Sequence, residues 1–195
     1  DTLYPEFRYG DGREVERAKD SYKHEIAAFE LDTMLGLGLV PPCVERKIGS
    51  RKGSLCLWVE RSMTEDRRRE DGLDPPDPVQ FKAQMREVRL FQQLIADLDY
   101  SNIRNLVIDT NFQVYKVDSS MAYYPDPELL PELNSAHVSR RFLRALETLD
   151  KKEMNERLNR WLLKVQRGDL WARRNRILKR ADKLIAEYGE EVVLY

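Results

Sequence analysis

The stretch FQQLIADLDYSNIRNLVIDTNFQVYKVDSSMAYY, residues 91–124, decides the fold that this sequence predicts. It opens with the apolar end of a helix, passes through a polar loop at 97–105, and continues into short strands expected at 106–108 and 112–117. Turn-forming residues at 109–111 separate the two strands, so the sequence predicts a β-hairpin.

Four polar side chains of this stretch are brought within reach of one another when the hairpin forms: Asp99, Asn102, Asn105 and Asp118. Carboxylates and carboxamides gathered in this way suit a hard divalent cation that also binds phosphate oxygens. A simpler interpretation stays open for each residue. Asp99 and Asn102 could bond local backbone in a turn, and Asp118 could cap the end of its strand.

The length and composition are those of a folded globular chain. With 195 residues the sequence can bury one substantial core, so one domain or two closely joined lobes are expected. The formal net charge of −1 argues against nucleic acid as the main partner. No apolar run is long enough to span a membrane, and no secretory signal opens the chain. The sequence favours a cytoplasmic location, with any targeting signal lying before Asp1, where the chain begins without a Met.

The two cysteines, Cys43 and Cys56, lie in apolar surroundings and lack the spacing of a metal site. Buried free thiols are therefore expected in preference to a disulfide. His24 and His137 are too few and too far apart in the sequence for a zinc centre or a Ser-His-Asp triad.

The N-terminal part predicts one helix after a polar connecting segment. The segment covers residues 1–19 and holds a turn at 9–12. The helix is expected at 22–37, because Ser21 offers an N-cap and glycine at 36 readily takes the left-handed conformation that ends a helix. Glu25 lies in this helix, where a solvated or salt-bridged role is the simpler interpretation.

Two apolar strands, 43–48 and 54–60, surround a glycine-containing loop and predict a second hairpin. The charged, proline-rich residues 61–78 show no core pattern and predict a solvated linker. A helix with a core-facing apolar arc is expected at 79–96.

The C-terminal part predicts packed helices at 139–149, 151–165 and 170–188. This part also carries a group of basic residues: Arg140, Arg141, Lys151, Lys152, Arg173, Arg174, Arg176, Lys179 and Arg180. A solvated helical surface accounts for them, and a phosphate-binding or partner-binding patch is the alternative.

The hairpin stretch resembles a known pattern. The Leu-Ile pair at 94–95, Asp99, Asn105 and the run VDSSMAY at 117–123 are similar, in order and separation, to motifs of atypical kinases. These include the secretory-pathway kinases of the family with sequence similarity 20 and, more distantly, the phosphoinositide lipid kinases. The chain most resembles an uncharacterised bacterial branch of that superfamily, with a likeness that covers residues 20–195.

This resemblance implies an α+β, kinase-like, two-lobed fold. Residues 1–62 would form a partial, incomplete N-terminal lobe, and residues 63–78 a charged linker. Residues 79–195 would form a mainly helical C-terminal lobe that contains the catalytic hairpin.

The resemblance also implies roles for single residues in ATP- and Mg²⁺-dependent phosphoryl transfer. Asp99 is similar to the catalytic-loop aspartate that accepts the proton of a substrate hydroxyl. Asn105 and Asp118 resemble the metal-binding residues. Glu25 resembles the helix glutamate that pairs with a phosphate-binding lysine. Three residues would lie near the hinge that meets the adenine: Trp58, Val59 and Glu60.

The sequence departs from the family pattern in several places. Asp99 and Asn105 are six positions apart, one more than in the family motif, as if a residue had been inserted at Tyr100-Ser101. Ser119 stands where a histidine is usual. Residues 1–19 show neither a glycine-rich loop nor an apolar strand carrying the expected lysine. Both are expected upstream of Asp1, and the alternative is that the protein does without them.

Three functions are consistent with these observations. The first is an active kinase that uses ATP and Mg²⁺ to phosphorylate a hydroxyl of a protein or small molecule. The second is a pseudokinase, which binds nucleotide or serves as a scaffold without efficient catalysis. The third is a binder of phosphate-rich ligands that uses the basic helices. Retention of Asp99, Asn105 and Asp118 favours the first two.

Overall fold

Helix α3 (Pro78–Ile95) carries much of the hydrophobic core. In this computed structural model, which describes residues 1–8, 14–130 and 136–195, the Asp77 carboxylate caps the helix by accepting from the Val79 and Gln80 amides at 3.0 and 2.9 Å. The helix ends at Ala96, which adopts a left-handed conformation with φ 46°. The helix predicted at 79–96 is therefore confirmed.

The predicted central hairpin is confirmed, and it belongs to a small antiparallel sheet. Strands β6 (Leu106–Ile108) and β7 (Val114–Lys116) pair, and β5 (Met63–Thr64) adds to the other edge of β6. Strand β7 starts later than expected, because Phe112 has φ 58° and the Asp109 carboxylate holds the turn.

The segment expected to be a solvated linker contains regular structure. It includes β5 and helix α2 (Glu65–Glu70), whose N-cap Thr64 accepts from the Arg67 amide at 3.2 Å. The Glu65 carboxylate is buried and pairs with Arg68 and Arg69. Some of the charged residues that were expected to be solvated therefore form ion pairs within the protein. The division of the chain into two lobes at this segment remains a prediction.

The expectation of a connecting segment at residues 1–19 is wrong. Strands β1 (Thr2–Arg8) and β2 (Glu14–Asp20) form an antiparallel pair that leads directly into helix α1. Their residues are largely exposed and polar, which is why no strand pattern was visible, although Ala18 is fully buried. The turn expected at 9–12 lies outside the described residues.

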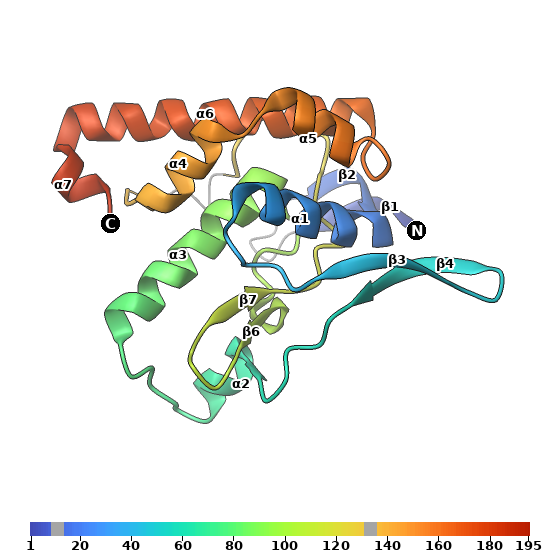
Figure 1. Cartoon of the computed structure of the whole chain (residues 1–195), viewed down its shortest axis with the longest axis horizontal. Helices are drawn as coiled ribbons and strands as arrows, with labels where there is room; N and C mark the ends of the chain where they lie inside the picture. Colours follow the sequence, from blue (N-terminus) through green and yellow to red (C-terminus); the bar gives the residue numbers. More distant parts are fainter. Residues whose placement is uncertain (9–13, 131–135) are drawn as a thin grey trace.

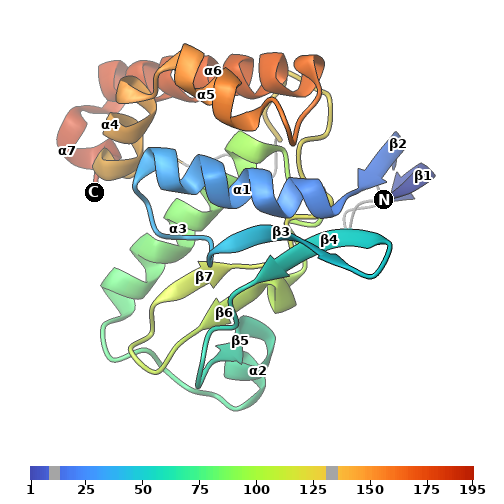
Figure 2. The same cartoon turned by 45° about the vertical axis from the view of Figure 1, so that its right-hand side comes forward.

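Helix α1 (Tyr22–Leu35) confirms the predicted N-terminal helix. The Ser21 hydroxyl caps its start and Gly36 ends it with φ 64°. The helix lies between the C-terminal helices on one side and β3 and β7 on the other, as Figure 1 and Figure 2 show. It is buried on several sides, which places the intermediate residue Glu25 at the edge of the core.

Strands β3 (Cys43–Ile48) and β4 (Arg51–Cys56) form the second predicted hairpin, which projects from the body in Figure 1. Strand β4 begins and ends earlier than predicted, so residues 57–60 leave the strand.

The structure corrects the expectation of free thiols, because Cys43 and Cys56 form a disulfide. The two residues face each other in the register of β3 and β4, and opposite residues of an antiparallel pair bring their Cβ atoms close together. The expectation relied on local apolar neighbours and did not take this register into account. Cys43 is buried and Cys56 is exposed.

The C-terminal part is helical, as predicted, with different boundaries. It contains α4 (Arg140–Thr148), α5 (Lys151–Leu158), α6 (Lys164–Tyr188) and the short α7 (Glu190–Val193). Helix α6 starts earlier than expected and includes Gly168 in its interior. These helices, α1 and α3 share one hydrophobic core, to which fully buried side chains such as Phe91, Leu94, Phe142 and Leu170 contribute.

Candidate functional site

A cavity of about 300 Å³ opens beside α1, β4 and the central hairpin. This volume is at the lower end of the range for small-molecule sites. Its lining residues combine apolar side chains with two carboxylates at one side: Glu25, Ser54, Cys56, Leu57, Trp58, Val59, Ser62, Val107, Val117 and Asp118.

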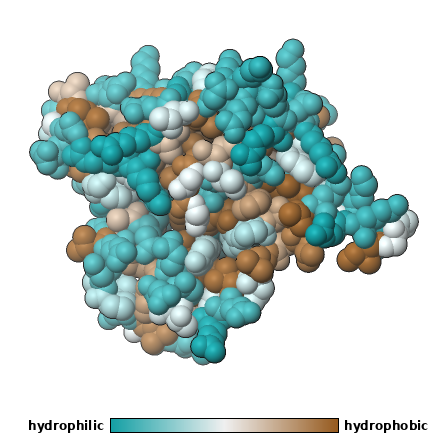
Figure 3. All heavy atoms as spheres, viewed as in Figure 1, coloured by the Kyte–Doolittle hydropathy of each residue, from teal (hydrophilic) through white to brown (hydrophobic). Residues whose placement is uncertain are grey.

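The cavity brings together four of the predicted site residues, namely Glu25, Trp58, Val59 and Asp118. Glu60, predicted with them, is exposed and is not among the lining residues. Trp58 is 80% exposed, and hydrophobic residues are visible on the protruding hairpin in Figure 3. Trp58 therefore offers an exposed apolar side chain at the cavity, against which a planar ligand could stack.

Glu25 and Asp118 form the polar side of the cavity. Burial raises the pKa of Glu25 to about 7, and the negative charge of Asp118 and a hydrogen bond with Asp118 add to this rise. A hydrogen bond from the Ser119 amide and the positive charge of Lys116 lower the pKa in part. Asp118 has φ 52°, a conformation that is uncommon outside glycine and that clusters at functional sites. Its Oδ1 accepts from the Ser120 hydroxyl at 2.9 Å. Two acidic groups held this close together favour the binding of a cation.

Asp99 lies in the loop between α3 and β6, where one of its carboxylate oxygens accepts two hydrogen bonds. The donors are the side-chain amides of Asn102, at 2.9 Å, and Asn105, at 2.8 Å. Burial raises the pKa of Asp99, and the charge of Asp97 adds to this, while the two amides oppose it. Of the four residues that the sequence grouped together, Asp99, Asn102 and Asn105 are therefore joined by hydrogen bonds, whereas Asp118 lines the cavity.

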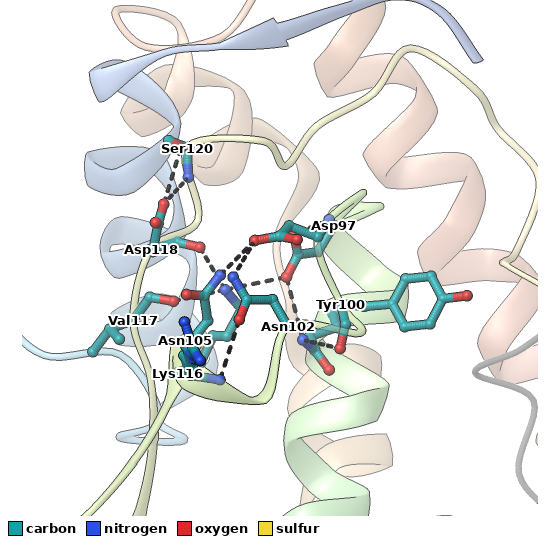
Figure 4. A network of polar contacts seen from close by, with 11 residues as sticks. Asp97, Tyr100, Asn102, Asn105, Lys116, Val117, Asp118 and Ser120 are labelled. Atoms are coloured by element: carbon teal, nitrogen blue, oxygen red, sulfur yellow. Dashed lines mark hydrogen bonds and ion pairs between the residues drawn. The ribbon is translucent and has the colours of Figure 1, made fainter. Parts of the chain in front are cut away.

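The Asp99 loop is joined to the cavity through Asn105. The backbone carbonyl of Asn105 accepts from the Val117 amide at 2.9 Å, and Val117 lines the cavity. Figure 4 shows Asn105 between the loop and the segment that leads to Asp118. Asp99 and Asn105 themselves are not among the cavity-lining residues.

Two charged residues of this site were missed by sequence reasoning. Lys116 and Asp97 are both fully buried and form an ion pair with 3.1 Å between Nζ and Oδ2. The signal for Lys116 was present in the alternation of β7, because Lys116 falls on the same face as the buried Val114. A lysine at an inward strand position needs a buried acidic partner.

The phosphate-binding lysine expected upstream of Asp1 to pair with Glu25 stays a prediction, and two lysines of the described residues have other partners. Lys19 lies on β2, directly before α1, but its ammonium group bonds the Asp1 carboxylate at 3.1 Å. The lysine whose charge acts on the Glu25 carboxylate is Lys116, on β7.

A second polar network fixes the segment that follows Asp118. The buried His24 ring contacts the Ser120 carbonyl through Nδ1 at 2.9 Å and the Gln166 amide through Nε2 at 3.2 Å. Gln166 also donates to the Tyr123 carbonyl at 2.9 Å. Because His24 and Glu25 are neighbours on α1, this network ties the Glu25 helix to the Asp118 segment.

Protein side chains can supply part of a metal site here. Among the described residues, no group of three or more His, Cys, Asp or Glu side chains has the geometry to hold a metal ion. Glu25 and Asp118 would therefore act as a pair of carboxylate ligands and leave other positions to water or to phosphate oxygens.

Several basic residues of the C-terminal helices are engaged within the protein. Arg173 is fully buried and donates to the Leu94 carbonyl at 2.8 Å and to backbone carbonyls at Tyr124 and Asp126. Arg174 donates to the Leu146 carbonyl at 2.9 Å, and Arg141 pairs with Glu87. These side chains hold elements together and do not form an open basic patch.

In the part of the chain that the structure describes, no helix has the length and apolar character needed to cross a membrane.

Comparison with known proteins finds similarity at the level of the fold. No protein-family model matches the sequence, and no curated protein matches it. A solved structure of hydra Fam20 with sugar is similar at a TM-score of 0.65 and 14% identity, covering 90% of this chain and 74% of that chain. The crystal structure of the Golgi casein kinase is similar at a TM-score of 0.61 and 12% identity, covering 96% of this chain and 72% of that chain.

The likeness to a bacterial branch and to lipid kinases remains a prediction. What the similar structures establish is the kinase-like part of the expected fold class: the chain has a Fam20-like kinase fold.

Proposed function

We propose that the protein is a phosphotransferase that uses ATP and a divalent cation such as Mg²⁺ to phosphorylate a hydroxyl group. The observation that carries this proposal is the pairing of Glu25 with Asp118 at one side of a cavity whose other walls are apolar. Such a cavity suits a nucleotide, because the base needs apolar contact and the phosphates need a cation.

The two carboxylates fit a hard cation. Glu25 has a pKa of about 7 because of its burial and of Asp118, so a positive ion between the two would relieve an unfavourable arrangement. When bound, Mg²⁺ would neutralise charge on the β- and γ-phosphates. Glu25 and Asp118 would hold it, and Asn105 is the further candidate ligand that the resemblance implies.

Trp58 and Val59 would contact the base, with the backbone of residues 57–60 at the hinge position. Glu60 would contribute through its backbone only, since its side chain is exposed outside the cavity.

Asp99 would act as the base that receives the proton of the acceptor hydroxyl. Its carboxylate is held by two amides, which fixes its direction, and its remaining oxygen has no hydrogen bond to a described residue. One similar structure is of a Fam20 solved with a sugar and the other is of a casein kinase, so saccharide and protein hydroxyls are the acceptors to test first.

A pseudokinase is the second candidate, and the departures of the sequence from the family pattern favour it. The Asn105 hydrogen bond to Asp99 does not separate the two candidates, because Asn105 donates through Nδ2 and its Oδ1 would be the atom that contacts a cation. In a pseudokinase the cavity would bind nucleotide and phosphoryl transfer would be slow.

A phosphate-rich ligand, nucleic acid included, is the least supported partner. Such a ligand would need basic side chains of the C-terminal helices to be free for contact with its phosphates, and Arg173, Arg174 and Arg141 are used in contacts within the protein.

The disulfide bears on the compartment. Disulfides persist in oxidising compartments and are rare in the cytoplasm. The Cys43–Cys56 bond therefore favours an oxidising compartment over the cytoplasmic location that the sequence suggested.

Thermal denaturation with ATP, with and without Mg²⁺ or Mn²⁺, tests the proposal. Ligand at about 100 times its Kd should stabilise the protein by about 2.7 kcal/mol. The shift should need the cation and should be lost in Asp118→Asn and Glu25→Gln. Glu30→Gln is the matched control, because Glu30 lies on the same helix but pairs with Arg157. No shift in wild type, or a shift that survives Asp118→Asn, would overturn the proposed site.

Transfer of the γ-phosphate to casein or to a saccharide acceptor then separates the two candidates. An active kinase should lose transfer by about 100-fold or more in Asp99→Asn while it keeps the thermal shift. Nucleotide binding without transfer in wild type would identify the pseudokinase.

A further inference from the structure

Lys116 has the properties of a structural cation placed inside the candidate site. Its side chain is fully buried, and its ammonium group makes three contacts. They reach Asp97 Oδ2 at 3.1 Å, the Val117 carbonyl at 2.7 Å and the Asp118 carbonyl at 2.6 Å.

These contacts exclude Lys116 as a ligand for phosphate. An ammonium group has three protons, and each has an acceptor within the protein. A lysine that contacts nucleotide phosphates must present a proton to the cavity, and Lys116 is not among the lining residues. Any role of Lys116 in the site must therefore be indirect, through the Asp97 carboxylate and the backbone carbonyls that it contacts.

Asp97 fixes the loop that carries Asp99. Its Oδ1 accepts from the backbone amide of Asp99 at 3.1 Å. Its Oδ2 pairs with Lys116 and also accepts from the Gln92 side chain, on α3, at 3.3 Å. Asp97 is thus fixed to the helix behind it and directs the Asp99 backbone.

One ion pair therefore reaches both candidate functional aspartates. Asp97 bonds the backbone of Asp99, and Lys116 bonds the backbone of Asp118, as Figure 4 shows for the contacts around Asp97 and Lys116. The Asp99 loop follows α3 and the Asp118 segment follows β7, and no other ion pair joins the two in the described residues.

We propose that the Asp97–Lys116 pair is a positioning device for phosphoryl transfer, which fixes Asp99 and Asp118 relative to each other. This proposal rests on the proposed function. Asp97 and Lys116 contact the backbone of Asp99 and of Asp118 and would not touch the substrate, so they are positioning residues and not catalytic residues. Phosphoryl transfer depends strongly on geometry, and a displacement of about 1 Å can reduce the rate about 100-fold.

The test removes the pair without leaving a buried charge. Single substitutions such as Lys116→Met strand the partner charge and should lower the melting temperature steeply. The double variant Asp97→Leu/Lys116→Met replaces both charges by apolar groups and should recover most of that loss. It keeps the core filled while it removes the contacts to Asp99 and Asp118.

Two measurements on this double variant and one on a control variant decide the proposal. The kcat for transfer should fall about 100-fold, with a smaller change in KM for ATP. Amide hydrogen exchange should become faster at 99–105 and at 117–122 together, and stay unchanged in α6. The double variant Glu30→Leu/Arg157→Met, which removes an ion pair between α1 and α5, should leave kcat unchanged.

Unchanged kcat in a folded double variant would overturn the proposal, as would faster exchange in one segment without the other. The exchange measurement does not need activity. If wild type neither binds nucleotide nor transfers phosphate, the proposed function fails, while the exchange data still show whether the pair holds the two loops together.

Discussion

The side-chain amide of Asn105 donates a hydrogen bond to the Asp99 carboxylate at 2.8 Å. The two residues form this bond although they are six positions apart in the sequence, one more than in the family motif. The short 3-10 helix η1 (Ile103–Asn105) winds the loop back on itself, and Asn102 caps it by accepting from the Arg104 amide at 3.3 Å. The extra residue at Tyr100-Ser101 is absorbed in the loop and does not keep the two side chains apart.

Asn105→Ala should reduce both stability and function. The nearly buried amide bonds the partly buried Asp99 carboxylate, so its loss should lower the free energy of unfolding by about 1–2 kcal/mol. If Asn105 also binds the cation, the thermal shift with ATP and Mg²⁺ should shrink. Urea denaturation and the nucleotide thermal shift measure the two effects separately.

Asn102→Ala is the control for this prediction, because Asn102 bonds the same Asp99 oxygen. It should leave the cation-dependent shift in place. Equal loss of the shift in both variants would mean that Asn105 acts through Asp99 and not as a ligand.

The disulfide should make a large contribution to stability. It closes a loop between residues 13 positions apart, and chain-entropy arguments give about 3 kcal/mol for a loop of that size. Cys43→Ser/Cys56→Ser should therefore unfold at a lower urea concentration than the oxidised protein. Thiol titration in denaturant should find no free thiol before reduction and two after it; free thiols in the untreated protein would contradict the structure.

Local signals predicted much of this fold. Ser21 and Gly36 marked the ends of α1 correctly, and the turn residues of the central hairpin gave its position, because caps and turns depend on residues close in sequence. The gathering of Asp99, Asn102 and Asn105 was visible for the same reason, since one short loop supplies all three.

Features that depend on partners distant in sequence could not be predicted in this way. The Cys43–Cys56 bond requires the register of two strands, and the Asp97–Lys116 pair requires the hairpin to fold back on α3. Strands β1 and β2 consist mostly of exposed residues, so they leave no apolar pattern. Arg173 looked like a surface cation because nothing near it in sequence shows the carbonyls that surround it.

Arg173→Met should be among the most destabilising substitutions in α6. Its guanidinium group is fully buried and serves carbonyls from α3 and from the segment after Asp118; burial lowers the pKa of this arginine to about 10. Loss of these bonds leaves buried acceptors without a donor and should cost about 3 kcal/mol or more. Arg176→Met, on the same helix, removes an exposed pair with Glu128 and should cost less than about 1 kcal/mol. Similar losses in urea denaturation of the two variants would refute the structural role of Arg173.

Two neighbouring groups on α1 give stability opposite dependences on pH. Burial lowers the pKa of His24 from 6.5 to about 4, so the stability that neutral His24 provides is present above pH 6.5 and is lost as the pH falls toward 4. Burial, with Asp118, raises the pKa of Glu25 from 4.5 to about 7, so the stability that protonated Glu25 provides is present below pH 4.5 and is lost as the pH rises through 7. In wild type the two effects oppose each other between these limits.

Single variants should separate the two effects. The difference in unfolding free energy between wild type and His24→Asn should grow by roughly 3 kcal/mol as the pH rises from 4 to 6.5, because His24 then no longer has to give up a proton to fold. The difference between wild type and Glu25→Gln should change in the opposite direction as the pH rises from 4.5 to 7, because the buried carboxyl must ionise beside Asp118. Urea denaturation at half-unit steps of pH, without nucleotide or divalent cation, measures both differences. If either difference stays constant across its range, that group does not have the buried environment described for it, and if both change in the same direction, the assignment of His24 and Glu25 to opposing effects is wrong.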